Sequence, residues 1–351
     1  MTPRLEPLHL LVFGAGAVGT YVGGSLSIAG HRVAFLERQG TGERLRIQGI
    51  RLRLPGGETL LKTPTVYTSL EAALDTSLPY DAAVFALKGY HTPSAIEMMR
   101  SVVDRMPPVV CMQNGIENEA ALAGVLGSDN VIPGTVTSAI GRQDIGDIIL
   151  ERLRGIGLSG SHPIIPALLA ACNQAGLNAR YYPNTAGMKW SKLLTNLTAN
   201  ATAAILQMTP GEIFSHRGLF KLEQAQFLEA LNVMKAHGIP VVDLPKTPVR
   251  ALALVFRSLP SALSRPILQR AIGSGRGNKM PSFFLDLHSG SSQSEVDHLN
   301  GAVVRAGNKA GIPTPANHFL TRTLMDLTSK EIPINAYAKQ PEKLLASYKS
   351  M

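Results

Sequence analysis

The chain has 351 residues, a length typical of two domains. Apolar residues make up 45% and charged residues 17%, which is enough apolar side chain to bury a core and excludes extensive disorder. Two cysteines exclude a disulfide framework, and no apolar run approaches the roughly 18 residues of a membrane span. We therefore expect no membrane association and a cytoplasmic location.

The net charge of +9 comes from 34 Lys and Arg residues against 25 Asp and Glu residues. The basic residues are spread along the chain, and an aromatic fraction of 5% is too small for a base-stacking surface. These features argue against nucleic-acid binding. A locally positive cleft for anionic small molecules fits the charge better.

Short apolar runs alternate with helical patterns in the first half of the chain. Strands are expected at residues 8–13, 32–36, 82–86, 109–112 and 131–137, with helices at 20–29 and 94–105 between them. This alternation predicts an α/β fold with a parallel sheet that is covered on both faces, that is, a doubly wound sheet. Further strands at 147–150, 155–158 and 179–182 are expected to include antiparallel pairs at the sheet edge.

Helical patterns replace the strands after residue 186, at 188–205, 219–237, 293–309 and 316–330. We therefore predict two domains, an α/β domain at 1–185 and an all-helical domain at 186–351. Residues 243–280 are rich in Pro, Arg and Ser, and their glycine-rich end at 273–279 is expected to be a loop.

A glycine-rich motif follows the first strand and opens the first helix. The first glycine permits a tight turn, the second lets a pyrophosphate approach the backbone, and the third allows the helix to pack on the strand. The helix N-terminus then offers N–H groups to the phosphates. The motif predicts a dinucleotide site, formed by Gly14, Ala15, Gly16, Ala17, Val18 and Gly19.

Two charged residues of opposite sign, Glu37 and Arg38, end the second strand. An acidic residue at this point usually binds the ribose hydroxyls of NAD, whereas an arginine accommodates the 2′-phosphate of NADP. Successive strand residues point to opposite faces, so we expect only one of the two to face the ribose.

A lysine and two asparagines, Lys192, Asn196 and Asn200, recur at every fourth position within the expected helix at 188–205. This spacing predicts one polar stripe facing a ligand. Lys189, one turn earlier, is the alternative candidate for a catalytic lysine. The nine histidines show no metal-ligand spacing, so no metal is expected.

In this order the motifs resemble those of the ketopantoate reductase family, the 2-dehydropantoate 2-reductases, over roughly residues 10–325. The resemblance rests on the glycine motif, on Ala86-Leu87-Lys88, on residues 112–115, on the Lys192 helix, and on residues 294–301 followed by 311–315. It implies an N-terminal Rossmann domain that binds NADPH, a helical C-terminal domain, and reduction of a small-molecule 2-oxo acid.

The resemblance also implies roles for individual residues. Lys192 takes the place of the catalytic lysine, and Glu295 that of a glutamate that helps to hold the substrate hydroxyl. Arg38 matches the arginine that meets the 2′-phosphate. The other positions carried over are Lys88 and Asn114 near the nicotinamide and its ribose, and Asn196, Asn200 and Ser282 at the substrate.

Two departures from the family pattern leave alternatives open. The chain is some tens of residues longer than typical members, mostly within 243–280, so a paralogous reductase of a different 2-oxo acid is the main alternative. Glu37 beside Arg38 leaves the choice between NADPH and NADH open. A non-catalytic NADP-binding sensor would not need Lys192, Asn196 and Glu295 together. The sequence does not determine the oligomeric state; a homodimer is one that it allows.

Overall fold

The computed structural model of the chain describes residues 6–276 and 279–350. They form two compact units: the first comprises Met1–Lys189 and Leu244–Thr247, the second Trp190–Asp243 and Pro248–Met351. The division falls inside helix α7 (Thr185–Leu197), so the first turn of α7 belongs to the first unit and the remainder to the second. The sequence places the division at residues 185 and 186, where this helix begins.

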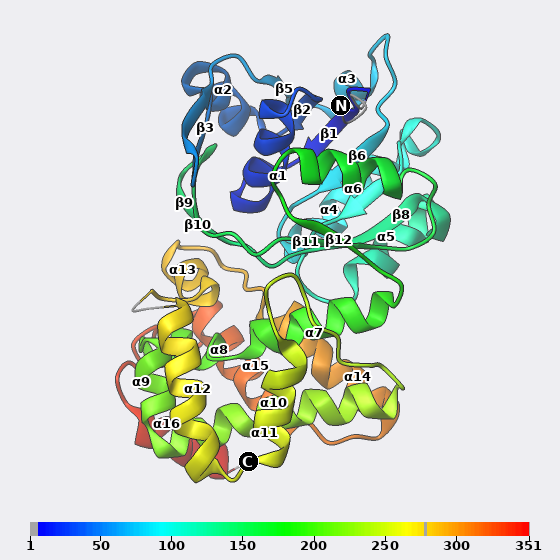
Figure 1. The fold of residues 1–351 in the computed structure, drawn as a ribbon. Helices are drawn as coiled ribbons and strands as arrows, with labels where there is room; N and C mark the ends of the chain where they lie inside the picture. The colour runs from blue at the N-terminus through cyan, green and yellow to red at the C-terminus, as the bar shows by residue number, and fades with distance from the viewer. Residues whose placement is uncertain (1–5, 277–278, 351) are drawn as a thin grey trace. The chain divides into compact units, whose positions relative to one another are not determined.

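The first unit is built on an eight-stranded sheet in the order β12-β11-β8-β7-β6-β1-β2-β5 (Figure 1). In the run β8-β7-β6-β1-β2-β5 every pair of neighbouring strands is parallel. At the other edge β11 is antiparallel to β8, and β12 is parallel to β11. The strand order reverses at β1, which makes the sheet doubly wound and confirms the predicted Rossmann fold class. The strands are β1 (His9–Phe13), β2 (Arg32–Leu36), β5 (Thr65–Tyr67), β6 (Ala82–Phe85), β7 (Val109–Cys111), β8 (Val131–Val136), β11 (Ile156–Ser159) and β12 (Ala179–Tyr182).

Helices cover both faces of this sheet because its central strands are apolar on both sides. In β1, Leu10 and Val12 join one hydrophobic cluster, whereas Leu11 and Phe13 join the other. The first cluster includes residues of α1 (Ala17–Ile28) and α6 (Ile165–Gln174). The second includes residues of α3 (Leu70–Leu74), α4 (Thr92–Arg100) and α5 (Asn118–Leu126). Near-continuous apolar runs of this kind are typical of buried parallel strands.

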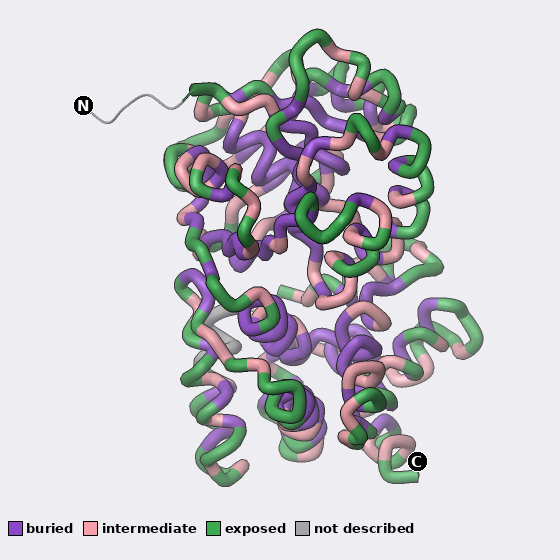
Figure 2. Tube along the Cα trace, turned by 90° about the vertical axis from the view of Figure 1, so that its right-hand side faces the viewer, coloured by how far each residue is buried: buried purple, intermediate pink, exposed green. Residues whose placement is uncertain are grey.

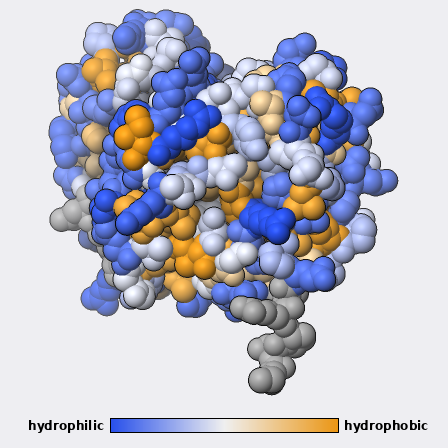
Figure 3. All heavy atoms as spheres, turned by 90° about the horizontal axis from the view of Figure 1, so that it is seen from above, coloured by the Kyte–Doolittle hydropathy of each residue, from blue (hydrophilic) through white to orange (hydrophobic). Residues whose placement is uncertain are grey.

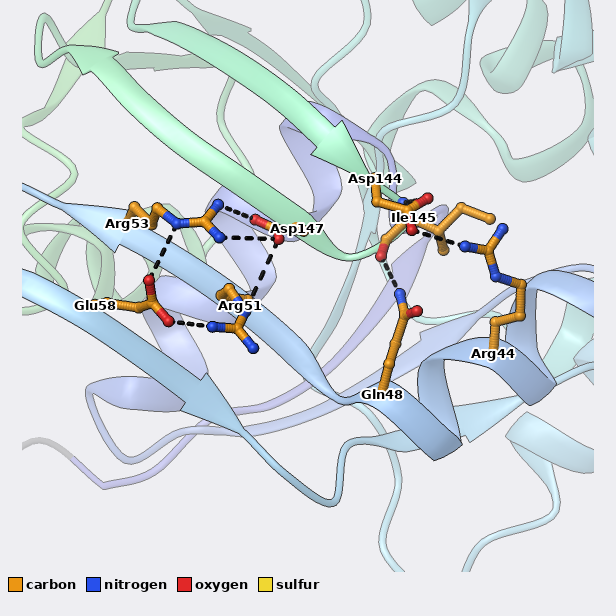
Figure 4. Close-up of polar contacts among 8 residues, drawn as sticks. All are labelled: Arg44, Gln48, Arg51, Arg53, Glu58, Asp144, Ile145 and Asp147. Atoms are coloured by element: carbon orange, nitrogen blue, oxygen red, sulfur yellow. Dashed lines mark hydrogen bonds and ion pairs between the residues drawn. The ribbon is translucent and has the colours of Figure 1, made fainter.

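A separate four-stranded sheet has the order β4-β3-β10-β9, with β3 (Ile50–Leu54), β4 (Gly57–Leu61), β9 (Ala139–Asp144) and β10 (Asp147–Arg152). The strand expected at 147–150 is therefore in this sheet and not at the edge of the large one. On one face Arg51 and Arg53 form ion pairs with both Glu58 and Asp147 (Figure 4). Ile50 and Leu52, which alternate with these arginines, are fully buried.

In the second unit the described regular elements are all helical, as predicted. Buried residues gather in the interior, and exposed residues occupy turns and outer helix faces (Figure 2). Helix α10 packs against α11, α14, α15 and α16. After α7 the helices are α8 (Ala201–Leu206), α9 (Pro210–Ser215), α10 (Arg217–Ala236), α11 (Val249–Ser258), α12 (Ser261–Arg276), α13 (Ser282–His288), the π-helical turn η4 (Asp297–Gly301), α14 (Ala302–Ala310), α15 (Pro315–Thr328) and α16 (Pro341–Lys349).

Two expectations about this unit are wrong. The helix expected at 188–205 is two helices, α7 and α8, separated by residues 198–200. The glycine-rich stretch expected to be a loop is helical as far as Arg276, where α12 ends; residues 277–278 lie outside the described residues. Among the residues that the structure describes, none of the helices combines the length and apolar character needed to cross a membrane.

Candidate functional site

The turn from β1 into α1 has the geometry that its glycines predict. Gly14 has a φ of +89°, and a Cβ at this position would lie 2.7 Å from the side chain of Leu87. At Gly19 a Cβ would lie 1.8 Å from the Gly14 carbonyl oxygen, so only glycine allows this approach of α1 to the turn. A Cβ at Gly16 would meet nothing within 4 Å, and no side chain caps the α1 N-terminus there. The backbone is therefore open to an anion at the helix end.

The two charged residues after β2 lie in different surroundings. The Glu37 carboxylate accepts a hydrogen bond from the backbone N–H of Ala15, so it lies against the glycine turn. Arg38 is exposed, and its guanidinium lies 3.3 Å from Nδ1 of His91, which follows β6 in the 3-10 turn η1 (Gly89–His91). The carboxylate thus contacts the glycine turn, whereas the guanidinium is exposed to solvent.

The loops after β6 and β7 carry Lys88 and Asn114, and a glutamine joins them. The side-chain amide of Gln113, which is 3% exposed, donates to the carbonyl of Leu87 at 3.0 Å. The amide of Asn118 donates to the carbonyl of Asn114 at 2.8 Å. These bonds fix the backbone of the two loops at the carboxyl edge of the sheet, where doubly wound folds bind their ligands.

Lys189 is a buried structural cation in the first unit, with its side chain 5% exposed. Its ammonium lies 2.6 Å from the Glu119 carboxylate and donates to the carbonyls of Gln113 at 2.8 Å and Gly134 at 3.1 Å. Burial is the largest single influence on the pKa of Lys189 and would lower it, but the charge of Glu119, the neighbouring Cys111 and the hydrogen bond to Glu119 together hold the pKa above its ordinary value. The ammonium thus has two hydrogen-bond acceptors and one counter-ion within the protein.

Lys192 lies one turn later on α7, on a face that is only partly buried. Asn196 shares this face, four positions further along, whereas Leu193, Leu194 and Leu197 are buried on the other sides of the helix. The sequence prediction that this lysine and this asparagine share one helix face is therefore met by the structure. An ammonium and an amide on one face can bind the oxygen atoms of a carbonyl and a carboxylate.

Asn200 is not part of that helix stripe, because α7 ends at Leu197. The backbone turns at Ala199, which has a φ of +47°, and Glu223 accepts a hydrogen bond from its N–H at 2.7 Å. Asn200 occupies the N-cap position of α8, and its side chain contacts the start of α13. Its amide oxygen accepts from the N–H of Phe283 at 3.2 Å, and its amide nitrogen lies 3.4 Å from Oγ of Ser282.

Glu295 is buried, with 3% of its surface exposed, and it lies two residues before the π-helical turn η4. π-helical turns are rare and often mark functional positions. Helix α15 packs against both α8 and η4, so it connects the segments that follow Asn200 and Glu295. The second unit therefore contains all five positions that the family resemblance assigns to the substrate, namely Lys192, Asn196, Asn200, Ser282 and Glu295. The cofactor positions Gly14–Gly19, Arg38, Lys88 and Asn114 belong to the first unit.

Sequence reasoning assigned no role to three residues of the cofactor side, namely Glu119, Gln113 and His91. Glu119 lies 70 positions from its partner Lys189, and no spacing rule connects them. Gln113 lies inside the motif at 112–115, so its position in that motif could have indicated a role for it. The two cysteines are buried, and burial raises the pKa of both thiols, that of Cys172 to about 12, so neither is a candidate nucleophile.

The fold is a doubly wound sheet of the Rossmann class, with a glycine turn of the dinucleotide-binding type and a helical second unit. Comparison with protein families assigns the chain more closely. Residues 10–158 match the family described as ketopantoate reductase PanE/ApbA, and residues 184–328 match its C-terminal domain. The chain belongs to the ketopantoate reductase family.

Relatives cover nearly the whole chain at low identity. The 2-dehydropantoate 2-reductase of Halobacterium salinarum is 26% identical over 329 residues, which cover 91% of this chain and 97% of the relative. That of Pyrococcus horikoshii is 26% identical over 321 residues, or 89% of this chain and 95% of the relative.

Solved structures agree with the fold. A PanE/ApbA family ketopantoate reductase from Ralstonia eutropha has a TM-score of 0.77 at 26% identity and covers 92% of this chain and 99% of its own. D-mandelate dehydrogenase, solved with NADH and anilino(oxo)acetate, has a TM-score of 0.74 at 21% identity, covering 93% and 100%. That likeness concerns the fold alone.

Proposed function

We propose that this protein reduces a 2-oxo acid of the 2-dehydropantoate type, with NADPH as cofactor and Lys192 as general acid. The observation that carries the proposal is the half-buried polar face of α7, on which Lys192 and Asn196 stand one turn apart among buried leucines. An ammonium and an amide on one partly exposed helix face are suited to binding the oxygens of an oxo acid.

The dinucleotide fits the residues of the first unit. The Gly14–Gly19 turn leaves the backbone at Gly16 open, which suits a pyrophosphate, and Arg38 offers a guanidinium to a 2′-phosphate. Lys88 and Asn114 stand on the loops that we assign to the nicotinamide side. NADPH, when bound, would supply the hydride.

The residues of the second unit supply the rest of the chemistry. As the carbonyl oxygen gains negative charge, the Lys192 ammonium stabilises that charge and then donates a proton to the oxygen. Asn196 and Asn200 can donate N–H groups to the substrate carboxylate without adding charge. Glu295 can accept a hydrogen bond from a hydroxyl on the substrate.

The test is oxidation of NADPH by the purified protein across a panel of 2-oxo acids that includes 2-dehydropantoate. We expect turnover that requires Lys192 and a preference for NADPH over NADH. Absence of turnover with every 2-oxo acid, together with tight NADPH binding, would favour a sensor instead.

A different 2-oxo acid is the second candidate, because residues 243–280 exceed the usual length of the family and lead directly to Ser282. Helices α11 and α12 from this segment pack against α10, and Phe256 of α11 stacks on Phe227 at 4.2 Å within the core. Removing the segment would therefore open the core, so the substrate panel is a better test than a deletion.

A further inference from the structure

Helix α10 carries two buried polar side chains, Glu223 and Gln226, that the proposed chemistry does not use. Hydrophilic residues cover much of the face of the molecule shown in Figure 3, where water can satisfy their polar atoms. Glu223 and Gln226 are 1% and 0% exposed, so the protein itself has to satisfy theirs. Their hydrogen-bond partners lie on the segments that carry the substrate positions of the second unit.

Glu223 holds the turn between α7 and α8. One oxygen of its carboxylate accepts a hydrogen bond from the backbone N–H of Ala199 at 2.7 Å, and the other accepts from the hydroxyl of Thr202 in α8. Ala199 has a φ of +47°, a left-handed conformation that an alanine adopts at a cost and keeps only where its surroundings impose it. Glu223 therefore supplies bonds that keep the chain in an unfavourable turn.

This turn leads directly to Asn200 and, through it, to the start of α13. The amide oxygen of Asn200 accepts from the N–H of Phe283 at 3.2 Å, and its amide nitrogen lies 3.4 Å from Oγ of Ser282. A change in the backbone at Ala199 would therefore move Asn200 and disturb its contacts with α13. Asn200 and Ser282 are both positions that the family resemblance assigns to the substrate.

Gln226 connects α10 to two further segments of the second unit. Its side-chain oxygen accepts from the amide of Asn300 at 2.9 Å, and its amide nitrogen lies 3.4 Å from the carbonyl oxygen of Leu197, the last residue of α7. Asn300 is part of η4, the π-helical turn that begins two residues after Glu295. These contacts give Glu223 a fixed position relative to the end of α7 and to the segment that follows Glu295.

We propose that Glu223 is a positioning residue of the substrate site, which acts through Asn200 and Ser282 and does not itself touch the substrate. The inference rests on the proposed reduction of a 2-oxo acid. Because Glu223 fixes the turn at Ala199 before the substrate arrives, these side chains need not be ordered on binding. Loss of its hydrogen bonds should weaken substrate binding and leave the Lys192 ammonium, roughly two helix turns earlier on α7, in place.

The experiment is steady-state kinetics of the full chain with saturating NADPH and the 2-oxo acid that the wild type turns over best. Glu223→Leu removes both acceptors and should raise the KM for the oxo acid by about tenfold or more, with kcat within about threefold of the wild type. Partial unfolding would instead lower the apparent kcat at an unchanged KM, because it only reduces the amount of active protein. An unchanged KM in Glu223→Leu overturns the inference.

Two conservative variants separate the hydrogen bonds of Glu223 from its charge, and they also decide the question if Glu223→Leu does not fold. In Glu223→Gln the side-chain oxygen can still accept from Ala199 and the amide can donate to the oxygen of Thr202, so the KM should stay within about threefold of the wild type. Glu223→Asp keeps the charge but is one methylene too short to reach both partners, so its KM should rise. The reverse order of the two KM values overturns the inference.

A double variant tests whether Glu223 acts through Asn200. Glu223→Leu with Asn200→Ala should raise the KM little beyond Asn200→Ala alone, because both changes remove the same contribution to substrate binding. Increases of KM that multiply in the double variant would show that Glu223 acts by another route and overturn the inference.

The control for stability is Leu344→Ala. Leu344 is a fully buried residue of α16, which packs against α10 and lies outside the family match at 184–328. The urea midpoint should fall in this variant while the KM stays unchanged. A rise of KM as large as in Glu223→Leu would show that the KM follows stability in general, and it would overturn the inference. Absence of turnover by the wild type refutes the proposed function and the inference together, whereas normal wild-type turnover with an unchanged KM in Glu223→Leu refutes the inference alone.

Discussion

Two successive turns of α7 each carry a lysine, and the two lysines have different surroundings. Lys189 is 5% exposed, and Glu119 with two backbone carbonyls takes up its ammonium. Lys192 lies on a partly buried polar face beside Asn196. Three positions in a helix correspond to about 300°, so the two side chains point only about 60° apart, and their different partners distinguish them.

The comparison teaches that the partners of a cation, and not its residue type, decide what it can act on. An ammonium that is held by a buried carboxylate and two backbone carbonyls cannot donate a proton to a ligand without breaking buried contacts. Lys189 therefore stabilises the protein, and we assign the chemistry to Lys192.

The largest effect that tests this comparison is on turnover. Lys192→Ala should lower kcat by about 10²–10⁴-fold, because the ammonium acts on charge that develops mainly in the transition state. The affinity for NADPH and the urea midpoint should change little. Steady-state kinetics with the best 2-oxo acid provide the measurement. A loss below about tenfold would remove Lys192 from the general-acid role.

The second effect is on stability and concerns the other lysine. Lys189→Met should lower the free energy of unfolding by about 3–5 kcal/mol, because Glu119 is left buried without its partner. Urea unfolding measures this loss, and Glu119→Met should cause a comparable one.

The double variant Lys189→Met with Glu119→Met is the control for this prediction. It removes both charges, so it should be considerably more stable than the two single losses predict by addition. Simple additivity of the two losses would show that the ion pair is not the source of the stability. Activity at a temperature where all variants are folded should fall far less than in Lys192→Ala.

Much of the sheet could be predicted from sequence because its central strands are buried on both faces. β1, β2, β6 and β8 are short apolar runs that stand out against their surroundings. β3 and β4 were missed, because Arg51 and Arg53 alternate with buried residues and their charges are matched by Asp147, almost 100 positions away. A strand with alternating charged and apolar residues can be recognised as part of a sheet only when the strand that pairs with it is known.

The site was predicted in its residue types better than in its geometry. The helix periodicity placed Lys192 and Asn196 on one face, but it could not reveal the break before Asn200. That break depends on Glu223, which accepts the N–H of Ala199 from 24 positions away. The expected loop at 273–279 was wrong for a related reason: glycines only weaken a helix, and α12 continues through them to Arg276.

A smaller effect, on cofactor affinity, extends the comparison to a third cation, Arg38, whose side chain is exposed. Arg38→Ala should weaken NADPH by about tenfold and NADH much less, because only NADPH has a 2′-phosphate for the guanidinium. Fluorescence titration with each cofactor measures the two affinities. Glu37→Gln is the matched variant at the neighbouring position. If Arg38→Ala weakened both cofactors equally, the ribose contact would belong to Glu37, which lies against the glycine turn.

The smallest effect is the dependence of stability on pH that the buried lysine produces. The pKa of Lys189 is raised above its ordinary value of 10.5, so the folded state holds this proton more tightly than the unfolded state. The contribution of the Lys189 ammonium to the free energy of unfolding is therefore complete below about pH 10.5. It is lost as the pH rises through the pKa that Lys189 has in the folded state. As the pH rises above about 10.5, the wild type should lose more of its free energy of unfolding than the Lys189→Met, Glu119→Met double variant, which lacks this ammonium. Urea unfolding at a series of pH values gives both curves. Parallel curves would mean that the ammonium of Lys189 is no more basic in the folded protein than in the unfolded chain, and that its ion pair with Glu119 contributes nothing to folding.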